Sequence, residues 1–439
     1  MILKETKSSF FRVAKMGGLG MFIFSFQFLH AFGLSIYLPI SFLIAVSMLL
    51  VHFTTGIPKR HYIQKEDVFL LGTVVCGILP FLVFWKQSGI HNVLYSAAWL
   101  VVPLIYFFGS RIWFHASKIK LDQIGHAAVV SVIFLSISII IEFYLANTTG
   151  HYISDFIPFS ISKFPEAYVL GDLYLRPRGF TSEAGFSAVI FEALIPLSLF
   201  YLRNDKWKRY FFLLVVIPGY LLLFSAASFI CIFVAFSILV AFSSKNKIYR
   251  LAYLAIFAVG ILLSYIFISS FKWYLDQIMI RKIMEFSLPG VAVYSSVTPE
   301  TFSRLEVYSL GLKLISRFPY GIGWGMLSQM NASGVLLPEV AEVKGSGFIS
   351  MPLEIFVSSG LIGGGMFMFF VIRKIRRVLR SMNEIKPYLF MALVSVSLHH
   401  VAIMEFWFPM FWFLLALSDY INNRKTWNYT PDLLQSTVS

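Results

Sequence analysis

The chain has 439 residues, of which 58% are hydrophobic and 13% are charged, and its net charge is +14. Soluble domains carry about 25% charged residues, so this composition excludes an ordinary soluble protein. The positive charge is distributed over many short connections between apolar runs rather than gathered in one basic region, which argues against nucleic acid as a partner.

The apolar runs are continuous and about 20 residues long, which is typical of membrane-spanning helices and not of the alternating strands of a barrel. The stretch 210–242 is one apolar run, which we interpret as two spans joined by a tight hairpin. The sequence therefore predicts an all-α polytopic membrane protein, a single integral membrane domain over 1–439 with both termini on the same side. In chain order, the twelve predicted spans are 16–33, 35–54, 67–85, 91–109, 125–146, 183–202, 210–224, 227–242, 251–270, 347–371, 387–404 and 406–421.

The lysines and arginines predict the orientation of the spans. About two thirds of these 36 residues lie in one alternating set of connections, and the positive-inside rule assigns that set to the cytoplasm. Both termini are then cytoplasmic, where basic residues also meet anionic lipid headgroups. Two long loops, 147–182 and 271–346, lie on the outer side. Both are rich in Phe, Tyr, Leu and Ile, and long loops that are not disordered are usually functional.

Several classes of site are not indicated. Cys76 and Cys231 both lie in apolar runs, and the histidines form no metal-ligand pattern. We therefore expect no disulfide framework, no metal site and no cofactor. A proton- or ion-coupled carrier usually has more intramembrane charge, and no internal repeat typical of transporters is visible. Charge inside the predicted spans is scarce apart from four glutamates, Glu142, Glu192, Glu354 and Glu405.

The first long loop ends in YLRPRGFTSEAGF, where a proline separates Arg176 from Arg178 and favours an extended backbone. Thr181 or Ser182 is expected to cap the sixth span, with Glu183 in its first turn. A helix N-terminus attracts anions, and two guanidinium groups add bidentate donors that suit phosphate. Alternatively, the arginines reach lipid headgroups and Glu183 offsets the helix dipole.

The second long loop contains an apolar pattern at helical spacing, formed by Leu305, Tyr308, Leu312 and Ile315. The pattern predicts an amphipathic helix that lies on the membrane surface or caps the bundle. The helix should end at the segment FPYGIGWG, because proline and three glycines terminate helices and permit a tight backbone.

Charged side chains of this predicted helix are a second set of candidates. Arg304 and Glu306 stand at its start, and Lys313 and Arg317 are four residues apart and share one face. They are candidate substrate contacts; otherwise, the basic residues of an interfacial helix point toward headgroups.

Glu354 lies one to two turns into the tenth predicted span. A carboxylate at that depth needs a partner or water. It is either a catalytic or substrate-contacting group near the outer face or a structural partner for a hydroxyl or an arginine on another span. His399 and His400, near the outer end of the eleventh span, are interpreted as polar packing.

Three segments, in this order, resemble the O-antigen polymerase and ligase superfamily of integral membrane glycosyltransferases (the Wzy and WaaL types). RPRGFTSEAGFSAVIFEALIPL is similar to an arginine–glycine–acid stretch that enters a membrane helix in the family. SRLEVYSLGLKLISRFPYGIGWG resembles its pattern of arginine, aromatic residue and Pro-x-Gly-x-Gly. GFISMPLEIFVSSGLIGGGMFMFF is similar to its span ending in Gly-Leu-Ile-Gly. The resemblance covers 170–371 well and the N-terminal third in general character.

Two departures from the family pattern affect the expected activity. Ligases carry a His-Asn pair about eleven residues before Gly-Leu-Ile-Gly, where this chain has Ile349 and Ser350, and the hairpin 224–229 reads FSAASF without the common Ser-Arg. The missing histidine favours a polymerase over a ligase and removes one candidate base.

The resemblance implies a GT-C-like enzyme of the bacterial inner membrane whose active site faces the periplasm. Its substrates would be undecaprenyl-pyrophosphate-linked oligosaccharides, polymerised into O-antigen or a similar surface polysaccharide, as in lipopolysaccharide biosynthesis. A chain-length regulator and a flippase are candidate partners. The alternatives are an O-antigen ligase, a flippase or other transporter for lipid-linked oligosaccharides, and a scaffold for polysaccharide assembly.

The resemblance also implies roles for the candidate residues. Arg176, Arg178 and Arg304 would hold pyrophosphate or an anionic sugar, because preorganised cations stabilise the charge that develops on the leaving group. Arg317 and Glu354 would be further substrate contacts. The base for the acceptor hydroxyl would be a carboxylate, Glu183 or Glu306. This chemistry requires neither a metal ion nor a nucleotide sugar.

Overall fold

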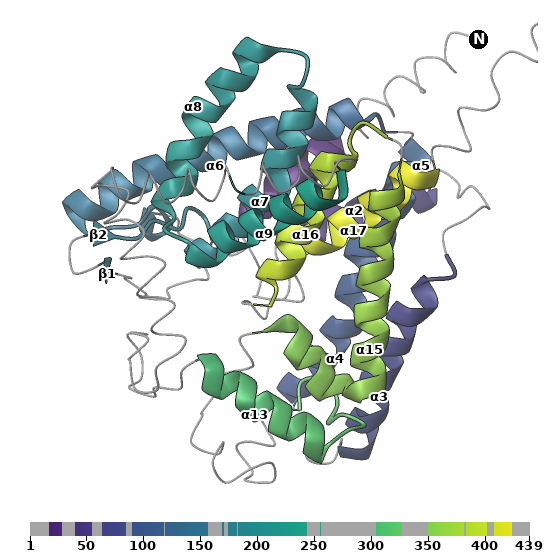
Figure 1. The fold of residues 1–439 in the computed structure, drawn as a ribbon. Helices are drawn as coiled ribbons and strands as arrows, with labels where there is room; N and C mark the ends of the chain where they lie inside the picture. Colours follow the sequence, from purple (N-terminus) through teal and green to yellow (C-terminus); the bar gives the residue numbers. More distant parts are fainter. Residues whose placement is uncertain are drawn as a thin grey trace, which may run out of the picture.

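The computed structural model describes residues 17–28, 40–54, 64–84, 90–117, 119–156, 169–170, 174–181, 183–243, 255, 304–326, 350–381, 383–401 and 408–423. This part of the chain is almost entirely helical (Figure 1). A helix over 17–25 runs into the 3-10 turn η1 (Phe26–Phe28), and a second 3-10 turn, η4 (Ile153–Phe156), follows the longest helix of the first half. The helices are α2 (Ile40–Thr54), α3 (Asp67–Phe84), α4 (Ile90–Pro103), η3 (Leu104–Gly109, a π-helical segment), α5 (Ser110–Ser117), α6 (Leu121–Thr149), α7 (Ala184–Tyr201), α8 (Lys206–Leu222), α9 (Ala226–Ser243), α13 (Arg304–Arg317), α15 (Met351–Arg380), α16 (Lys386–His399) and α17 (Pro409–Asn423).

The fold is that of an all-α membrane protein. Among the described residues, α6, α7 and α15 are long and apolar enough to cross a membrane, and several shorter helices are also apolar. A pair of two-residue strands, β1 (Val169–Leu170) and β2 (Tyr174–Leu175), is antiparallel and lies in the first long loop. Every predicted span overlaps a described helix except 251–270, which lies almost wholly outside the described residues. The predicted hairpin in 210–242 is confirmed as two helices, α8 and α9.

Local sequence signals set several helix ends. α6 ends at Gly150, whose φ of 75° is the left-handed conformation that glycine adopts at helix C-termini. The N-cap of α8 is Asp205, whose carboxylate accepts the Lys208 backbone N–H at 3.0 Å.

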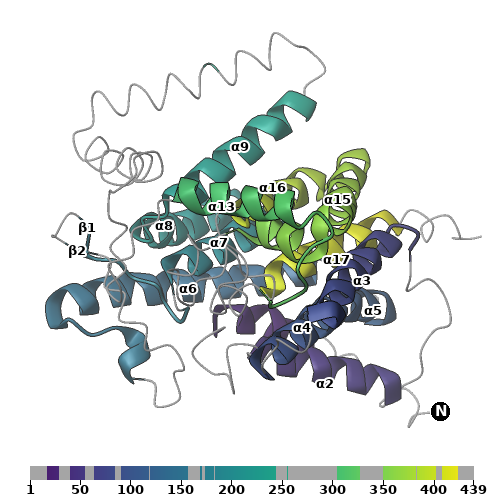
Figure 2. The ribbon, with the colours of Figure 1, turned by 90° about the horizontal axis from the view of Figure 1, so that it is seen from below.

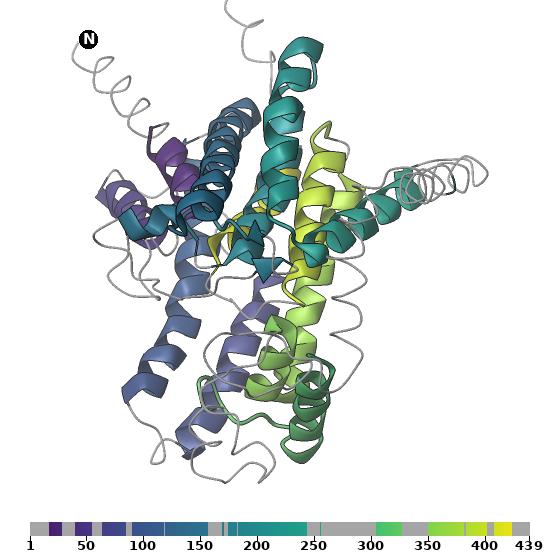
Figure 3. The ribbon, with the colours of Figure 1, turned by 90° about the vertical axis from the view of Figure 1, so that its left-hand side faces the viewer.

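The helices form an upper group and a lower group in Figure 1, and the long part of α15 extends through both. α15 runs beside α3, as both Figure 1 and Figure 3 show. In the upper group α6 packs on α7 and α8, and α16 packs on α7 and α9. Small residues allow close approach: a Cβ at Gly219 of α8 would lie 2.8 Å from the Ser136 Cα of α6.

Four fully buried charges join four helix ends; we call Asp67, Arg111, Lys374 and Asp419 the ion cluster. Nη1 and Nη2 of Arg111 donate to the two Asp67 oxygens at 2.6 and 2.9 Å, and Nη2 lies 2.7 Å from Asp419. Nζ of Lys374 donates to both Asp419 oxygens at 2.8 and 2.7 Å. All four side chains are 0% exposed. Two cations therefore balance two anions, which is the condition under which charges are tolerated inside a protein.

Arg377 extends the ion cluster toward the surface. Its Nη1 lies 2.7 Å from Asp419 and its Nη2 lies 2.5 Å from Glu66. Burial acts to raise the pKa of Glu66, but the hydrogen bond and charge of Arg377 outweigh it and the pKa is lowered. The expectation that charge inside the spans is scarce apart from four glutamates is wrong, because Asp67 and Asp419 lie in helices and are neutralised by cations from distant parts of the chain.

We predict that Asp67→Asn lowers the stability of the protein by about 3–5 kcal/mol, because it leaves Arg111 buried with one anionic partner fewer. Asp205→Asn is the matched control, since Asp205 pairs with Lys208 at the surface and asparagine also caps helices. The unfolding midpoint of purified protein in detergent should fall for Asp67→Asn and stay at the wild-type value for Asp205→Asn. Equal midpoints for both variants would show that the ion cluster does not stabilise the fold.

Candidate functional site

The RPRG segment is anchored by a glutamate of α6. Glu142 is 0% exposed, and its carboxylate accepts the backbone N–H groups of Arg178 at 2.7 Å, Gly179 at 2.5 Å and Ile153 at 3.1 Å. The two successive N–H groups of Arg178 and Gly179 reach the same carboxylate oxygen, and the chain then turns at Gly179, whose φ is 66°. One carboxylate therefore determines the shape of the loop on both sides of the strand pair.

Asn147, five residues further along α6, attaches the preceding strand. Its Oδ1 accepts the Leu175 N–H at 2.7 Å, and its Nδ2 donates to the Leu175 carbonyl at 3.1 Å. The end of α6 thus supplies a carboxylate and an amide to the same loop, and the loop starts in a defined position before it enters α7.

Arg178 is buried, with only 5% of its surface exposed. Its Nη2 donates to Ser154 Oγ at 2.9 Å, and its guanidinium lies 4.5 Å from the centre of the Tyr152 ring. Its carbonyl accepts hydrogen bonds from the hydroxyls of Thr181 and Ser187 at 2.9 and 2.6 Å. Burial raises the pKa of the Tyr152 phenol, although the charge of Arg178 acts to lower it. Arg178 therefore holds the first loop together as well as carrying charge.

Arg176 and Glu183 are more accessible than Arg178. The Arg176 side chain is half-buried, and its Nε donates to the Leu223 carbonyl at the end of α8 at 2.5 Å. Glu183 is exposed. The expectation that Thr181 or Ser182 caps this helix is wrong. The N-cap of α7 is Glu183, and the Glu183 side chain makes no capping hydrogen bond. The Thr181 hydroxyl is instead bonded to the Arg178 and Glu183 carbonyls.

The PYGIGWG turn docks into a break in α15. α15 is interrupted at Gly360, whose φ is 72° and whose ψ is −176°. The Ile322 and Gly323 N–H groups donate to the Val357 and Ser358 carbonyls at 3.0 and 2.9 Å, and Leu361 N–H donates to the Pro319 carbonyl at 2.8 Å. Backbone groups released by the break in the helix are therefore satisfied by the turn. The tenth predicted span is therefore not one straight helix.

Two glycines make this backbone contact possible. A Cβ at Gly321 would lie 2.6 Å from the Gly360 nitrogen, and a Cβ at Gly360 would lie 2.5 Å from the Pro319 oxygen. Gly321 also has a positive φ of 88°. Trp324, which follows, is fully buried. Its indole N–H donates to the Val74 carbonyl of α3 at 3.1 Å, and its backbone N–H donates to the Gly77 carbonyl of α3 at 3.2 Å.

The helix predicted in the second loop is confirmed as α13. It lies at the lower end of the molecule in Figure 1, is near the viewer in the view from below in Figure 2, and packs on α15. The predicted apolar face is partly wrong: Leu312 is 64% exposed, whereas Gly311 and Leu314 are buried. The packed face is rotated because Gly311 fits against Leu353 of α15.

The remaining candidate residues lie on α13 and α15. Arg304 and Glu306 are in the first turn of α13, and their side chains lie outside the described part of the structure. Arg317, the last residue of α13, is exposed and lies 5.6 Å from the Phe318 ring centre. Glu354 is buried in the first turn of α15. Glu405 falls outside the described residues.

A buried acid–imidazole pair joins α7 and α16. Oε1 of Glu192 lies 2.6 Å from Nδ1 of His399, and its Oε2 accepts the Ser395 hydroxyl at 2.8 Å. Both side chains are at most 2% exposed. A carboxylate on Nδ1 orients an imidazole so that Nε2 is the accepting nitrogen, the arrangement of a general base. The prediction of polar packing for His399 agrees with this contact.

Contacts between helix ends bring the candidate elements to one end of the bundle. The Phe186 ring of α7 stacks 5.9 Å from Phe408, which lies 6.2 Å from the His400 ring. The Met351 N–H of α15 donates to the His400 carbonyl at 3.0 Å. The Tyr308 hydroxyl of α13 donates to the Val401 carbonyl. The start of α7, the end of α16, the start of α15 and α13 are thus connected.

Sequence reasoning missed the roles of Glu142 and of the Glu192–His399 pair. The available signal was the presence of two glutamates inside apolar runs, since a carboxylate there requires partners. Neither the N–H groups around Glu142 nor the imidazole beside Glu192 could be identified, because these partners are 11 to 207 residues away in the chain.

Within the described residues, no group of three or more His, Cys, Asp or Glu side chains is arranged to hold a metal ion. No protein-family model matches the chain, and no curated protein matches it significantly.

We predict that Gly360→Ala destabilises the protein by about 1–3 kcal/mol, because the methyl group meets the backbone of the PYGIGWG turn and the residue keeps a positive φ. Gly365→Ala is the control, since a Cβ there has no neighbour within 4 Å. Thermal unfolding in detergent should show a lower midpoint for Gly360→Ala. An unchanged midpoint would contradict the docked arrangement.

We predict that Glu142→Ala loosens the RPRG segment, because each buried N–H group left without an acceptor costs about 1–3 kcal/mol. Hydrogen exchange measured by mass spectrometry should become faster in peptides that cover 174–181. Ile141→Ala, at an adjacent exposed position of α6, should leave this exchange unchanged. Equal exchange in wild type and Glu142→Ala would refute the anchoring role.

Proposed function

We propose that this protein is a metal-independent membrane glycosyltransferase that polymerises undecaprenyl-pyrophosphate-linked oligosaccharide units into O-antigen or a similar surface polysaccharide. The observation that carries the proposal is the docking of the PYGIGWG turn into the break of α15 at Gly360. These two segments belong to the second and third motifs of the resemblance. Their contact gives a physical reason why both motifs occur in the same chain. Irregular backbone at membrane depth is tolerated where it is buried in protein or lines a cavity.

The proposed topology has twelve spans in a GT-C-like arrangement in the bacterial inner membrane, with both termini in the cytoplasm. Contacts between helix ends support it. Ends that the positive-inside count assigns to the cytoplasm meet in the ion cluster, whereas the RPRG segment, α13 and the start of α15 belong to the opposite, periplasmic end. A pairing of helix ends from opposite sides would have argued against this topology.

The proposed chemistry depends on cations around the leaving group. A lipid pyrophosphate leaves readily, so its negative charge needs stabilisation more than it needs a proton. Arg176, half-buried at the start of the segment that leads into α7, is the candidate in the first loop, and Arg304 is the candidate on α13. Arg178 contributes its charge from within the loop. His399 joins Glu183 and Glu306 as a candidate base, since its Nδ1 is held by Glu192.

Glycan ladders from cells that lack the gene test the function. A polymerase predicts surface glycans that carry a single repeat unit. Polymer that accumulates on its lipid carrier, with none on the lipid A core, would identify a ligase instead. Single units retained in the cytoplasmic leaflet would identify a flippase. Unchanged ladders would refute all three activities.

We predict that Arg176→Ala and Arg304→Ala each abolish chain extension while the protein accumulates to wild-type levels. Arg176→Lys should also lower extension strongly, because lysine cannot form the bidentate contact. Arg209→Ala, at the end of the bundle that we assign to the cytoplasm, is the control and should give normal ladders. Complementation of the deletion strain, with immunoblots for protein level, measures each effect; normal ladders from both alanine variants would refute the arginine site.

A further inference from the structure

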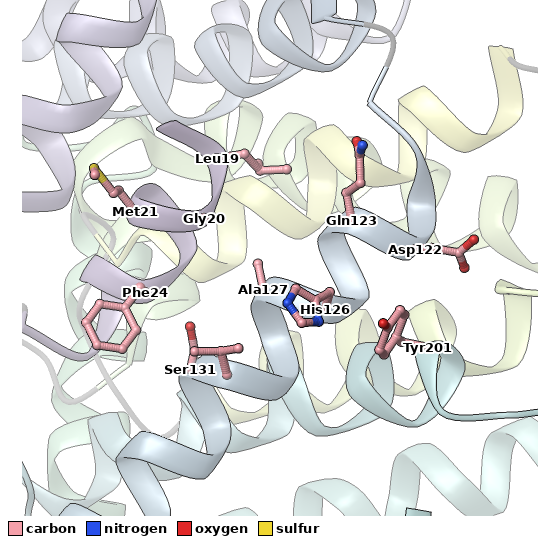
Figure 4. Close-up of a pocket in the computed structure, with 11 residues that line it drawn as sticks. Leu19, Gly20, Met21, Phe24, Asp122, Gln123, His126, Ala127, Ser131 and Tyr201 are labelled. Carbon is pink, nitrogen blue, oxygen red and sulfur yellow. The ribbon is translucent and has the colours of Figure 1, made fainter. Parts of the chain in front are cut away.

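A groove lies between the helix at 17–25 and the first half of α6, with Tyr201 of α7 at one side (Figure 4). Its volume is about 550 Å³, which is within the range of ligand pockets, about 300–1,000 Å³. Figure 4 shows Leu19, Gly20 and Phe24 on one helix, and Ala127 on α6 opposite them. The groove is lined by the first half of α6, whereas Glu142, which holds the RPRG segment, lies in the second half, so the groove contains none of the residues of the proposed glycosyltransferase site.

The walls of the groove are apolar and continue onto an exposed apolar surface. Met21 and Val130, which line it, are 66% and 48% exposed. Further along α6, Phe134, Ile137 and Ile141 are also exposed. Together with Val130 they are spaced three or four residues apart, which places all four side chains on one face of the helix. An exposed apolar stripe on a helix long enough to cross a membrane marks a surface that faces lipid.

The two ends of the groove differ in polarity. Phe24 and Phe134 close the inner end, with ring centres 5.1 Å apart. At the other end, Asp122 and His126 lie in the first two turns of α6, with the His126 ring 5.5 Å from Tyr201. Arg203 lies next to this end, 3.5 Å from Asp122. An amphiphile with one apolar chain and one polar head has the same distribution of polarity.

We propose that the groove binds one acyl chain of a membrane phospholipid, with the headgroup at the end formed by Asp122, His126 and Arg203. Since lipid tails are as apolar as leucine, moving an acyl chain from the bilayer into the groove removes no apolar surface from water. Retention of the lipid therefore depends on packing along the walls and on hydrogen bonds at the polar end. The lipid fills the space between two helices of the bundle and faces the surrounding bilayer at the exposed stripe.

Glycine substitutions allow a matched test. Gly20 lines the groove, and a Cβ there has no neighbour within 4 Å, so Gly20→Phe is expected to place its ring in the groove. Gly365→Phe is the control, because Gly365 is an exposed helical glycine of α15 with equally open surroundings. Both variants should unfold at the wild-type temperature in detergent, which separates loss of lipid from loss of fold.

Native mass spectrometry of the full chain, titrated with dioleoylphosphatidylethanolamine, measures the bound lipid. Wild type and Gly365→Phe should retain one lipid per chain, and Gly20→Phe should bind at least tenfold more weakly. His126→Ala should weaken retention severalfold, because it removes a hydrogen-bonding group from the polar end. Equal retention by all four proteins, or a wild type that retains no lipid, would overturn the proposal. A change in oligomeric state of Gly20→Phe would also overturn it and would identify the groove as a contact between copies of the chain.

Discussion

The ion cluster is the interaction on which the arrangement of the helices depends. In a bilayer, apolar surfaces have little preference for one another over lipid, so helices need other forces to fix their positions. Asp67, Arg111, Lys374 and Asp419 supply that force, because an unpaired buried charge is far more costly than a paired one. The cluster joins α3, α5, α15 and α17, and it thereby places α15 alongside α3.

The opposite end of the same helices is held by backbone contacts. α15 breaks at Gly360, and the released carbonyls accept hydrogen bonds from the PYGIGWG turn, while Trp324 continues from the turn into α3. Because the ion cluster aligns α3 and α15 at one end, the turn can contact both at the other. The break also allows the first part of α15, with Glu354, to meet the end of α16 at His400. The break at Gly360 and the PYGIGWG turn thus lie at the end where we propose catalysis.

The RPRG segment combines residues that stabilise the loop with residues that we propose bind the substrate. Arg178 is buried beside Tyr152, and the backbone around it is held by Glu142, so part of this charged motif stabilises the loop that presents the rest. Arg176 and Glu183 are then displayed at the entrance to α7. A loop preorganised in this way would lose little entropy on binding the proposed pyrophosphate, which is the property that electrostatic catalysis requires.

The sequence by itself determined the class of the protein, the position of nearly every described helix and the existence of α13, because apolar runs and helical periodicity are local properties of the chain. It also singled out the PYGIGWG turn and Glu142 as unusual. Tertiary structure alone decided the partners: the balance of Asp67 by Arg111, the N–H groups around Glu142, the break at Gly360 and the pairing of Glu192 with His399. These contacts join residues up to 207 positions apart, and the pairing of charges and backbone groups at such separations depends on packing that no local pattern encodes.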